Sequence, residues 1–249
     1  MTTNTFIQPL LERLVEYVGV RQTLQYASTC RSHALARKWL IENCSLVDYR
    51  RISELRKRGI EPKSVSAIPG TLKDLQKVPA IVTHVTFADS FNNSLLNATL
   101  PPKLTHLTFG YYFNRSLDHI TLPLNLTHLT FGGRFNRPLD NVTLPSKLTH
   151  LTFGSNFNQP LDNVTLPPTL TNLEFGYHFN QSLDNLTLPP RLTLLTFGYL
   201  FDRMLNYAKL PPTLTCIKID CEWRFYLHNQ HCMTQWLRSG RSLCRGQTK

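Results

Sequence analysis

The sequence has few charged residues, no long apolar run and little that marks it for secretion. Of its 249 residues, 17% are charged and 41% are hydrophobic, a composition that excludes an intrinsically disordered chain. No apolar stretch approaches the roughly 18–20 residues that span a bilayer. The first residues also lack a basic segment followed by an apolar core. We therefore expect an intracellular protein, cytoplasmic or nuclear, with six reduced cysteines and no membrane partner.

Arrangements of residues that carry enzyme or metal chemistry are also missing. The sequence contains no glycine-rich phosphate loop, no nucleophile elbow and no metalloprotease helix motif. The cysteines and histidines between Cys221 and Cys244 do not have the spacing of a zinc finger. We expect no catalytic residue, no metal and no cofactor, and hence a binding function rather than an enzyme.

A repeat of 22 residues dominates the middle of the chain. Phe-Asn, Phe-Gly and Leu-Pro pairs each recur at this spacing, without an insertion. The Phe-Asn pairs begin at Phe91, Phe113, Phe135, Phe157 and Phe179, and Phe201-Asp202 closes the series. The unit has the length of a leucine-rich repeat, roughly 20–29 residues, which favours a solenoid of stacked coils.

The unit at 104–125 indicates how one coil forms. Its Leu-x-x-Leu-x-Phe segment predicts a short strand in which Leu107 and Phe109 point inward. Gly110 lets the chain turn, Phe113 returns to the interior, and the following Asn is expected to bond backbone groups at the bend. About seven apolar side chains at ~1.5–3 kcal/mol each do not offset ~1.5 kcal/mol of ordering per residue, so a coil is stable only when stacked.

The tetrapeptides Phe-Asn-Arg-Pro (135–138) and Phe-Asn-Gln-Pro (157–160), set between Leu-Thr-x-Leu-Thr-Phe-Gly and Leu-Pro, resemble FNIP repeats. These repeats are similar to leucine-rich repeats and are abundant in giant DNA viruses and social amoebae. The resemblance covers residues 78–219 and implies a solenoid of about six repeats. The copies at 113–116 and 179–182 depart from it, because they carry Ser where the family has Pro.

The first 60 residues lack the repeat and show helical apolar spacing. Segment 10–31 resembles an F-box, although residues 6–9 depart from the usual opening of that family. An F-box implies binding to a Skp-type adaptor and, through it, to a cullin. The residues that match the adaptor-binding positions are Pro9, Leu10, Leu11, Leu14 and Val18.

This resemblance implies the substrate-recognition subunit of an SCF-type (cullin-RING) ubiquitin ligase whose repeats bind a target protein. The alternative is a stand-alone repeat scaffold with no link to ubiquitin ligases. In that case the N-terminal helices only cap the solenoid, as arrays of this kind require.

The expected fold is α+β, with a short helical domain followed by a β-solenoid. The predicted parts are an F-box-like domain (1–60), a linker or truncated first coil (61–77), the FNIP solenoid (78–219) and a C-terminal cap (220–249). Of the net charge of +11, residues 81–212 carry only +1, against +6 before them and +4 after them. Since the repeats are nearly neutral, nucleic acid is not the expected partner.

The outward strand positions and the turns beside them form the expected contact surface for a target protein, because solenoids present such surfaces to partners. The turn residues differ from coil to coil, as specificity positions do. A solvated polar ladder without a binding role is the alternative for the strand positions. The predicted target-binding residues are His84, His106, His128, His150, Tyr111, Tyr112, Arg134, Tyr177, His178 and Tyr199.

Overall fold

The computed structural model describes residues 46–48, 50, 52–57, 64–203, 205, 209–219 and 242–245. This part of the chain divides into two compact units. The first contains the described residues up to 67 together with 81–84, and the second contains 68–80 and the described residues from 85 onward.

Some predicted features lie outside the described residues. These are the F-box-like helices with Pro9, Leu10, Leu11, Leu14 and Val18, and most of the predicted C-terminal cap.

In the first unit, two short strands pair in parallel. β1 (Leu46–Asp48) pairs with β2 (Ser64–Ala67), and α3 (Ile52–Lys57) separates them along the chain. Val65 of β2 is buried, and its carbonyl oxygen accepts a hydrogen bond from the Thr83 backbone N–H at 2.9 Å.

The segment 61–77, for which a linker or truncated first coil is expected, contains β2 and α4 (Leu72–Gln76). Thr71 begins α4 with a capping box, in which the Thr71 hydroxyl accepts from the Asp74 N–H and the Asp74 carboxylate accepts from the Thr71 N–H. Leu75 is the buried residue of this helix.

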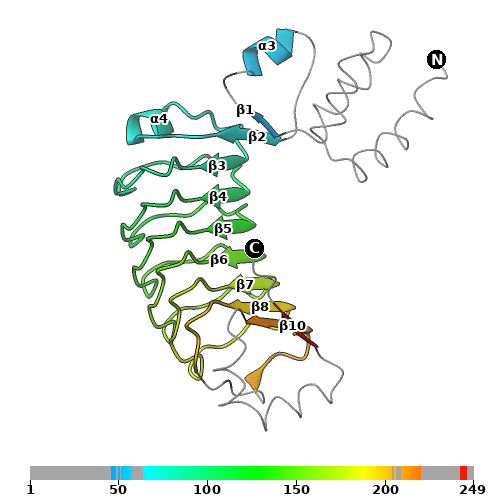
Figure 1. The fold of residues 1–249 in the computed structure, drawn as a ribbon. Coiled ribbons are helices and arrows are strands. Elements are labelled where there is room, and N and C mark those ends of the chain that lie inside the picture. Colours follow the sequence, from blue (N-terminus) through cyan, green and yellow to red (C-terminus); the bar gives the residue numbers. More distant parts are fainter. Residues whose placement is uncertain are drawn as a thin grey trace, which may run out of the picture. The chain divides into compact units, whose positions relative to one another are not determined.

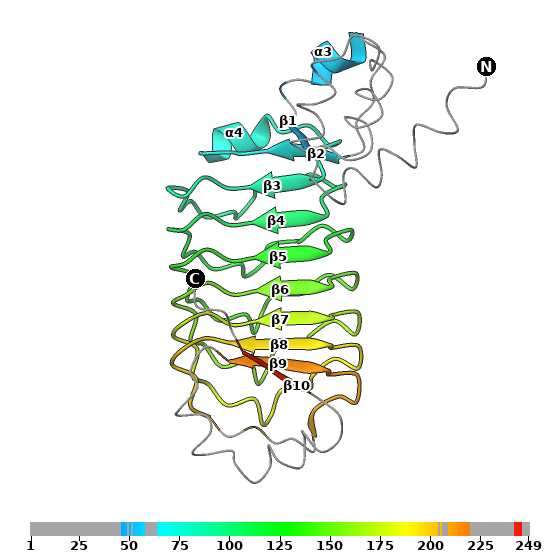
Figure 2. The ribbon, with the colours of Figure 1, turned by 45° about the vertical axis from the view of Figure 1, so that its right-hand side comes forward.

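The second unit is a parallel β-solenoid, which confirms the predicted repeat architecture. β3 (His84–Thr86) lies at the division between the units. From β4 onward, successive strands stack in chain order and pair in register, with Leu107 opposite Leu129 and Leu129 opposite Leu151 (Figures 1 and 2). The strands are β4 (His106–Thr108), β5 (His128–Thr130), β6 (His150–Thr152), β7 (Asn172–Glu174), β8 (Leu194–Phe197), β9 (Cys216–Ile219) and β10 (Ser242–Arg245).

The interior of the solenoid contains two columns of stacked phenylalanine rings. In the coil at 104–125, Leu107, Phe109 and Phe113 are buried, as predicted, and Leu117 is buried as well. The Phe109 ring stacks on that of Phe113 at 4.1 Å within the coil and on the equivalent ring of the next coil at 5.5 Å. Stacked aromatic pairs contribute about 0.5–1.5 kcal/mol each beyond the burial of their area, so these columns tie neighbouring coils together.

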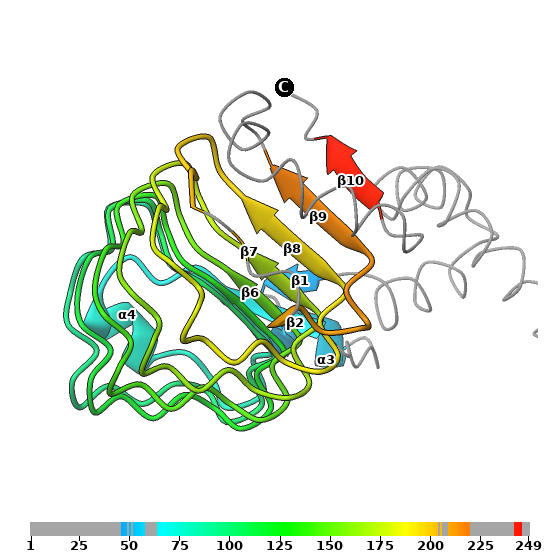
Figure 3. The ribbon, with the colours of Figure 1, turned by 90° about the horizontal axis from the view of Figure 1, so that it is seen from below.

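The distance between coils grows from the sheet toward the opposite side. Equivalent rings are 5.4–5.5 Å apart in the column nearest the sheet, which begins at Phe87, and 6.1–6.2 Å apart in the column that begins at Phe91. The strands themselves are about 4.8 Å apart in any sheet. The coils therefore converge on the strands, and the sheet forms the concave side of the solenoid; Figure 3 shows the strands along one side of the coils.

The asparagine that follows each phenylalanine bonds the next coil. The Asn114 side-chain oxygen accepts from the Asn136 backbone N–H at 3.1 Å, and the Asn136 oxygen accepts from the Asn158 N–H at 3.0 Å. The same bond recurs from Asn92 to the end of the series at Asp202. This confirms that the asparagines bond backbone groups, and each bond ties one coil to the next.

The glycine after each strand has a different purpose from the one expected. Gly110 is expected to supply freedom to turn, but neither it nor its equivalents has a left-handed φ. A Cβ at Gly132 would lie 1.9 Å from the carbonyl oxygen of Gly110, and one at Gly154 would lie 2.0 Å from that of Gly132. Glycine is needed here because the turns of neighbouring coils pack backbone against backbone.

Two further expectations have an outcome in the structure. Cys216 forms a disulfide bond, so the prediction of reduced thiols is wrong for this residue. That prediction followed from the compartment alone and carried no information on which sulfurs the fold brings together. Among the described residues, no helix is long and apolar enough to cross a membrane.

Candidate functional site

A column of histidines lies on the outer face of the strands. His106, His128 and His150 occupy equivalent positions in β4, β5 and β6, and all three are partly exposed. Their rings stack with centroids 4.1 Å apart and interplanar angles of 11° and 10°. We call these three residues the histidine column. His84, predicted to extend this row, belongs to the first unit.

A threonine orients each ring of the histidine column. Nδ1 of His128 lies 2.9 Å from the Thr127 hydroxyl, and Nδ1 of His150 lies 2.9 Å from the Thr149 hydroxyl. Both hydroxyls also donate, at 3.0 Å, to the carbonyl oxygen of the equivalent threonine one coil earlier. The ring orientations are therefore fixed by the ladder between coils.

The environment of the histidine column favours neutral imidazoles. Burial, and then the charges that His106 and His150 would carry, lower the pKa of His128 from 6.5 to about 4. Burial also lowers the pKa of His150. Near neutral pH both rings are therefore uncharged.

The stacked arrangement does not suit a metal ion. The lone pairs of stacked imidazoles are nearly parallel, whereas a metal needs ligands that converge on one point. Within the part of the chain that the structure describes, no group of three His, Cys, Asp or Glu side chains is placed to hold an ion. The column is thus a row of separate polar groups.

The turns that follow the strands carry exposed aromatic side chains. In the first group, the rings of Tyr111 and Tyr112 meet edge to face at 5.0 Å. The Arg134 guanidinium lies over the Tyr112 ring at 4.9 Å from its centroid, a cation–π contact. About half of the surface of each tyrosine is exposed.

A second aromatic group lies further along the same edge. Tyr177 and Tyr199 stack at 5.4 Å, and His178 meets the Tyr177 ring edge-on at 4.9 Å. Between Tyr111 and Tyr177, the equivalent position in the intervening coils is occupied by the small residues Gly133 and Ser155. We call both groups together the tyrosine ridge, whose members are Tyr111, Tyr112, Arg134, Tyr177, His178 and Tyr199.

The backbone beneath the tyrosine ridge is held by its own ladder of hydrogen bonds. The Arg134 N–H donates to the Tyr111 carbonyl at 2.9 Å, and the His178 N–H donates to the Ser155 carbonyl at 2.8 Å. Each such bond joins the turns of neighbouring coils, which the glycines allow to pack closely. The aromatic side chains therefore project from a rigid support, which lowers the conformational entropy lost on binding.

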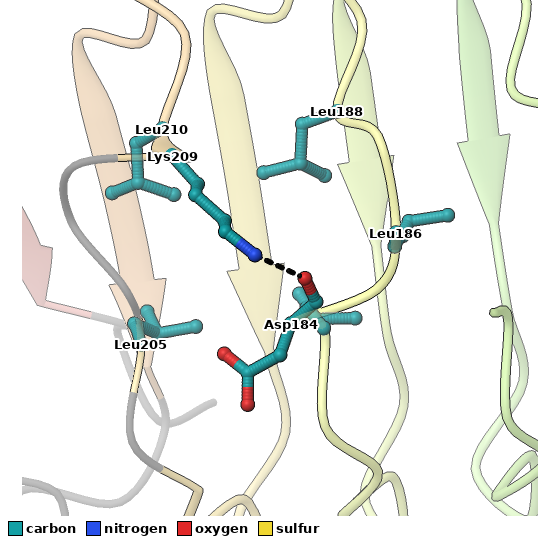
Figure 4. Close-up of a pocket in the computed structure, with 7 residues that line it drawn as sticks. Asp184, Leu186, Leu188, Leu205, Lys209 and Leu210 are labelled. Carbon is teal, nitrogen blue, oxygen red and sulfur yellow. Dashed lines mark hydrogen bonds between the residues drawn. The ribbon is translucent and has the colours of Figure 1, made fainter.

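A small hollow lies between two coils away from these surfaces (Figure 4). Lys209 crosses it, and its ammonium group donates to the Asp184 carbonyl oxygen at 2.8 Å. The remaining walls are leucine side chains, and there is room for little more than a water molecule. This hollow is a packing gap rather than a ligand site.

The family and structural comparisons agree with this geometry. The FNIP Repeat family model matches residues 91–134, 135–178 and 179–221, together more than half of the chain. The chain belongs to the FNIP repeat family. Its solenoid is also similar to that of CroV588, whose crystal structure is described as "a novel circular LRR protein structure", with 38% sequence identity and a TM-score of 0.58. That similarity covers 65% of this chain and 25% of CroV588, so the chain spans only about a quarter of its neighbour. No curated protein matches the chain.

The FNIP solenoid brings most of the predicted target-binding residues into two adjacent rows, one on the strands and one on the turns. Sequence reasoning missed the threonines that orient the histidines. Their signal was present, because Thr105, Thr127 and Thr149 directly precede the histidines at the 22-residue spacing. A hydroxyl that faces the neighbouring coil cannot be told from a solvated one without the register of the strands.

Proposed function

We propose that this FNIP solenoid is a protein-recognition module that binds a target protein through the tyrosine ridge and the adjoining histidine column. The observation that carries the proposal is a rigid, repeated frame on which the exposed turn residues differ from coil to coil. Apart from His178, the ridge and the turns between its two groups consist of Tyr, Arg, Ser, Gly and Asn. Antibody paratopes, which also bind proteins through turns on a rigid frame, are rich in these residues, and Tyr and Arg are common sources of affinity at protein interfaces.

The second part of the proposal concerns the N-terminal segment. Its resemblance to an F-box suggests that the chain joins its target to a Skp-type adaptor and a cullin, as an intracellular substrate-recognition subunit of an SCF-type ubiquitin ligase. The residues that we assign to the adaptor contact are Pro9, Leu10, Leu11, Leu14 and Val18. The alternative is a stand-alone scaffold with no link to ubiquitin ligases, in which the solenoid binds its target and the N-terminal helices only cap the solenoid.

Affinity capture with the full chain tests both parts. We expect a Skp-type adaptor, a cullin and at least one further protein to be recovered by the wild type. Leu11→Asp with Leu14→Asp should remove the adaptor and cullin while the further protein is retained. Recovery of that protein without the adaptor, by wild type and variant alike, would instead favour the stand-alone scaffold.

The target surface has its own variant and control. Tyr112→Ala with Tyr177→Ala should reduce capture of the target at least tenfold, because hot-spot tyrosines cost about 2 kcal/mol or more when truncated. Leu124→Ala is the matched control, since Leu124 is 76% exposed and is not part of the ridge. Equal capture by all three chains would show that the target binds elsewhere.

A further inference from the structure

The hydrogen bonds of Thr127 and Thr149 determine where the protons of two imidazoles lie. Each hydroxyl has one proton and lies 3.0 Å from a carbonyl oxygen of the preceding coil. A carbonyl oxygen only accepts, and two oxygens at this distance repel one another unless a proton lies between them. The hydroxyl proton is therefore directed to the carbonyl.

This leaves the threonine oxygen as the acceptor in its contact with the histidine. Nδ1 of His128 and of His150 must then carry the ring proton and donate it at 2.9 Å. A neutral imidazole has one protonated nitrogen, so Nε2 of each ring is an unprotonated acceptor. No protein group in the described structure donates to either Nε2 atom.

The same two strands supply donors beside these acceptors. Thr130 and Thr152 follow His128 and His150 by two residues, so their side chains lie on the same outer face of the sheet. In the described structure their hydroxyls make no hydrogen bond within the protein. The outer face of β5 and β6 thus offers two acceptors and two donors, repeated at the spacing of the strands.

The charges around this strip disfavour an anionic ligand. Glu174 lies opposite Thr152 in the strand register and is exposed. At the other end of the strip, the His106 ring stacks on that of His128. To pair with an anion, an imidazole of the column would have to be protonated. The charged ring would then lie about 4.1 Å from the neighbouring imidazole, centroid to centroid.

We propose that the strip formed by His128, His150, Thr130 and Thr152 recognises amide groups of a polypeptide, whose N–H groups donate to the Nε2 atoms and whose carbonyl oxygens accept from the threonine hydroxyls. This rests on the proposed function, since it names the chemistry by which a protein target is held. An amide fits because it combines a donor and an acceptor, as the strip does. The partner surface must also be convex, because the sheet is the concave side of the solenoid.

The protein alone tests the first step. Two-bond 1H–15N spectra of the full chain, with histidine labelled in the ring and assigned through His128→Asn and His150→Asn, report which nitrogen is protonated. Near neutral pH we expect Nδ1 to be protonated and Nε2 to be bare in both residues. A proton on Nε2, or charged rings at this pH, overturns the proposal regardless of any partner.

A phage-displayed dodecapeptide library tests recognition with the full chain. Selected peptides should bind His128→Leu with His150→Leu about tenfold or more weakly, because each variant leaves an N–H donor without its acceptor. Leucine fits this frame, since Leu194 occupies the equivalent position in β8 and the Thr193 hydroxyl still bonds the preceding coil at 3.1 Å. The selected peptides are then resynthesised with one backbone amide N-methylated at a time. Methylation at one or two positions should weaken binding to the wild type by a similar factor.

The possible outcomes separate this inference from the proposed function. Peptides that bind wild type and leucine variant equally, that tolerate every N-methylation, or that are selected for acidic side chains overturn the inference but leave a protein-binding module. Failure to select any peptide, with the expected ring protonation, overturns recognition by this strip and counts against the proposed function. Thr130→Val with Thr152→Val should independently weaken binding of the selected peptides, because this variant removes the two hydroxyl donors and leaves the histidines in place.

Discussion

Replacing Gly154 by alanine tests whether the turns of the solenoid pack as closely as the structure indicates. The new Cβ would lie 2.0 Å from the Gly132 carbonyl oxygen and 2.9 Å from the Gly133 Cα, both backbone atoms. No side-chain rotation relieves such a contact, so the two coils must separate by more than about 1 Å at this edge, an overpacking strain. The bond from the Asn156 N–H to the Gly133 carbonyl, 2.9 Å long, would lengthen or break.

Overpacking typically costs about 1–3 kcal/mol, and each lost hydrogen bond costs about 1 kcal/mol more. We therefore expect Gly154→Ala to lower the free energy of unfolding by about 2–4 kcal/mol, at or above the upper end of what single substitutions usually cost. Chemical denaturation followed by circular dichroism measures this change. Amide hydrogen exchange should show the largest loss of protection in the coils on either side of residue 154, since each coil contacts only its neighbours.

Gly133→Ala is the matched control one coil earlier. The three heavy atoms nearest its Cβ would be ring carbons of Tyr111, the closest at 2.4 Å, and this exposed side chain can rotate away. We expect a change within about 1 kcal/mol. Equal stability of Gly154→Ala and wild type would refute the close packing of the turns and the rigid support that we assign to the tyrosine ridge.

Three other perturbations have defined outcomes. Phe135→Ala should lower the free energy of unfolding by about 3–5 kcal/mol in denaturant titrations, since the ring is fully buried in its column, and a cost under ~1 kcal/mol would contradict that packing. Asn136→Ala should lower it by about 1–3 kcal/mol, because the Asn158 N–H and Gln159 amide lose their acceptor, and an unchanged midpoint would count against the ladder. The pKa of His128 is about 4 in the folded chain and has its ordinary value of 6.5 in the unfolded chain. Between these pH values the unfolded chain binds more protons, so the free energy of unfolding should decrease as the pH falls from 6.5 to 4. After allowance for solvent screening the loss is about 1–2 kcal/mol, and denaturation at several pH values should show a shallower loss for His128→Asn.

The sequence predicted the frame of the repeat well because periodicity reports directly on burial. Leu107, Phe109 and Phe113 recur at 22 residues and occupy the interior. The role of Gly110 was not accessible, because a close approach between coils depends on how far apart they stack. Predicting that His128 stacks on its neighbours likewise needs the strand register. Identifying the concave side needs the distances between coils on both sides of the solenoid.

The candidate site was predicted as a set of residues and not as an arrangement. The expected outward histidines and variable turn residues do lie on neighbouring rows, but the sequence did not indicate the ring contacts within each aromatic group, such as that of Arg134 with Tyr112. Nor did it indicate the hydrogen bonds that orient His150. Side-chain packing between coils decides both, and the sequence contains only the spacing of residues along the chain.

The central claim is that the variable edge of the FNIP solenoid binds a protein. Quantitative affinity capture compares the full wild-type chain with a variant that carries alanine at Tyr111, Tyr112, Tyr177 and Tyr199, after circular dichroism has shown that both fold. We expect at least one protein to be recovered about tenfold or more in excess by the wild type, because hot-spot tyrosines are lost from the variant. Identical recovery by both chains would contradict the claim.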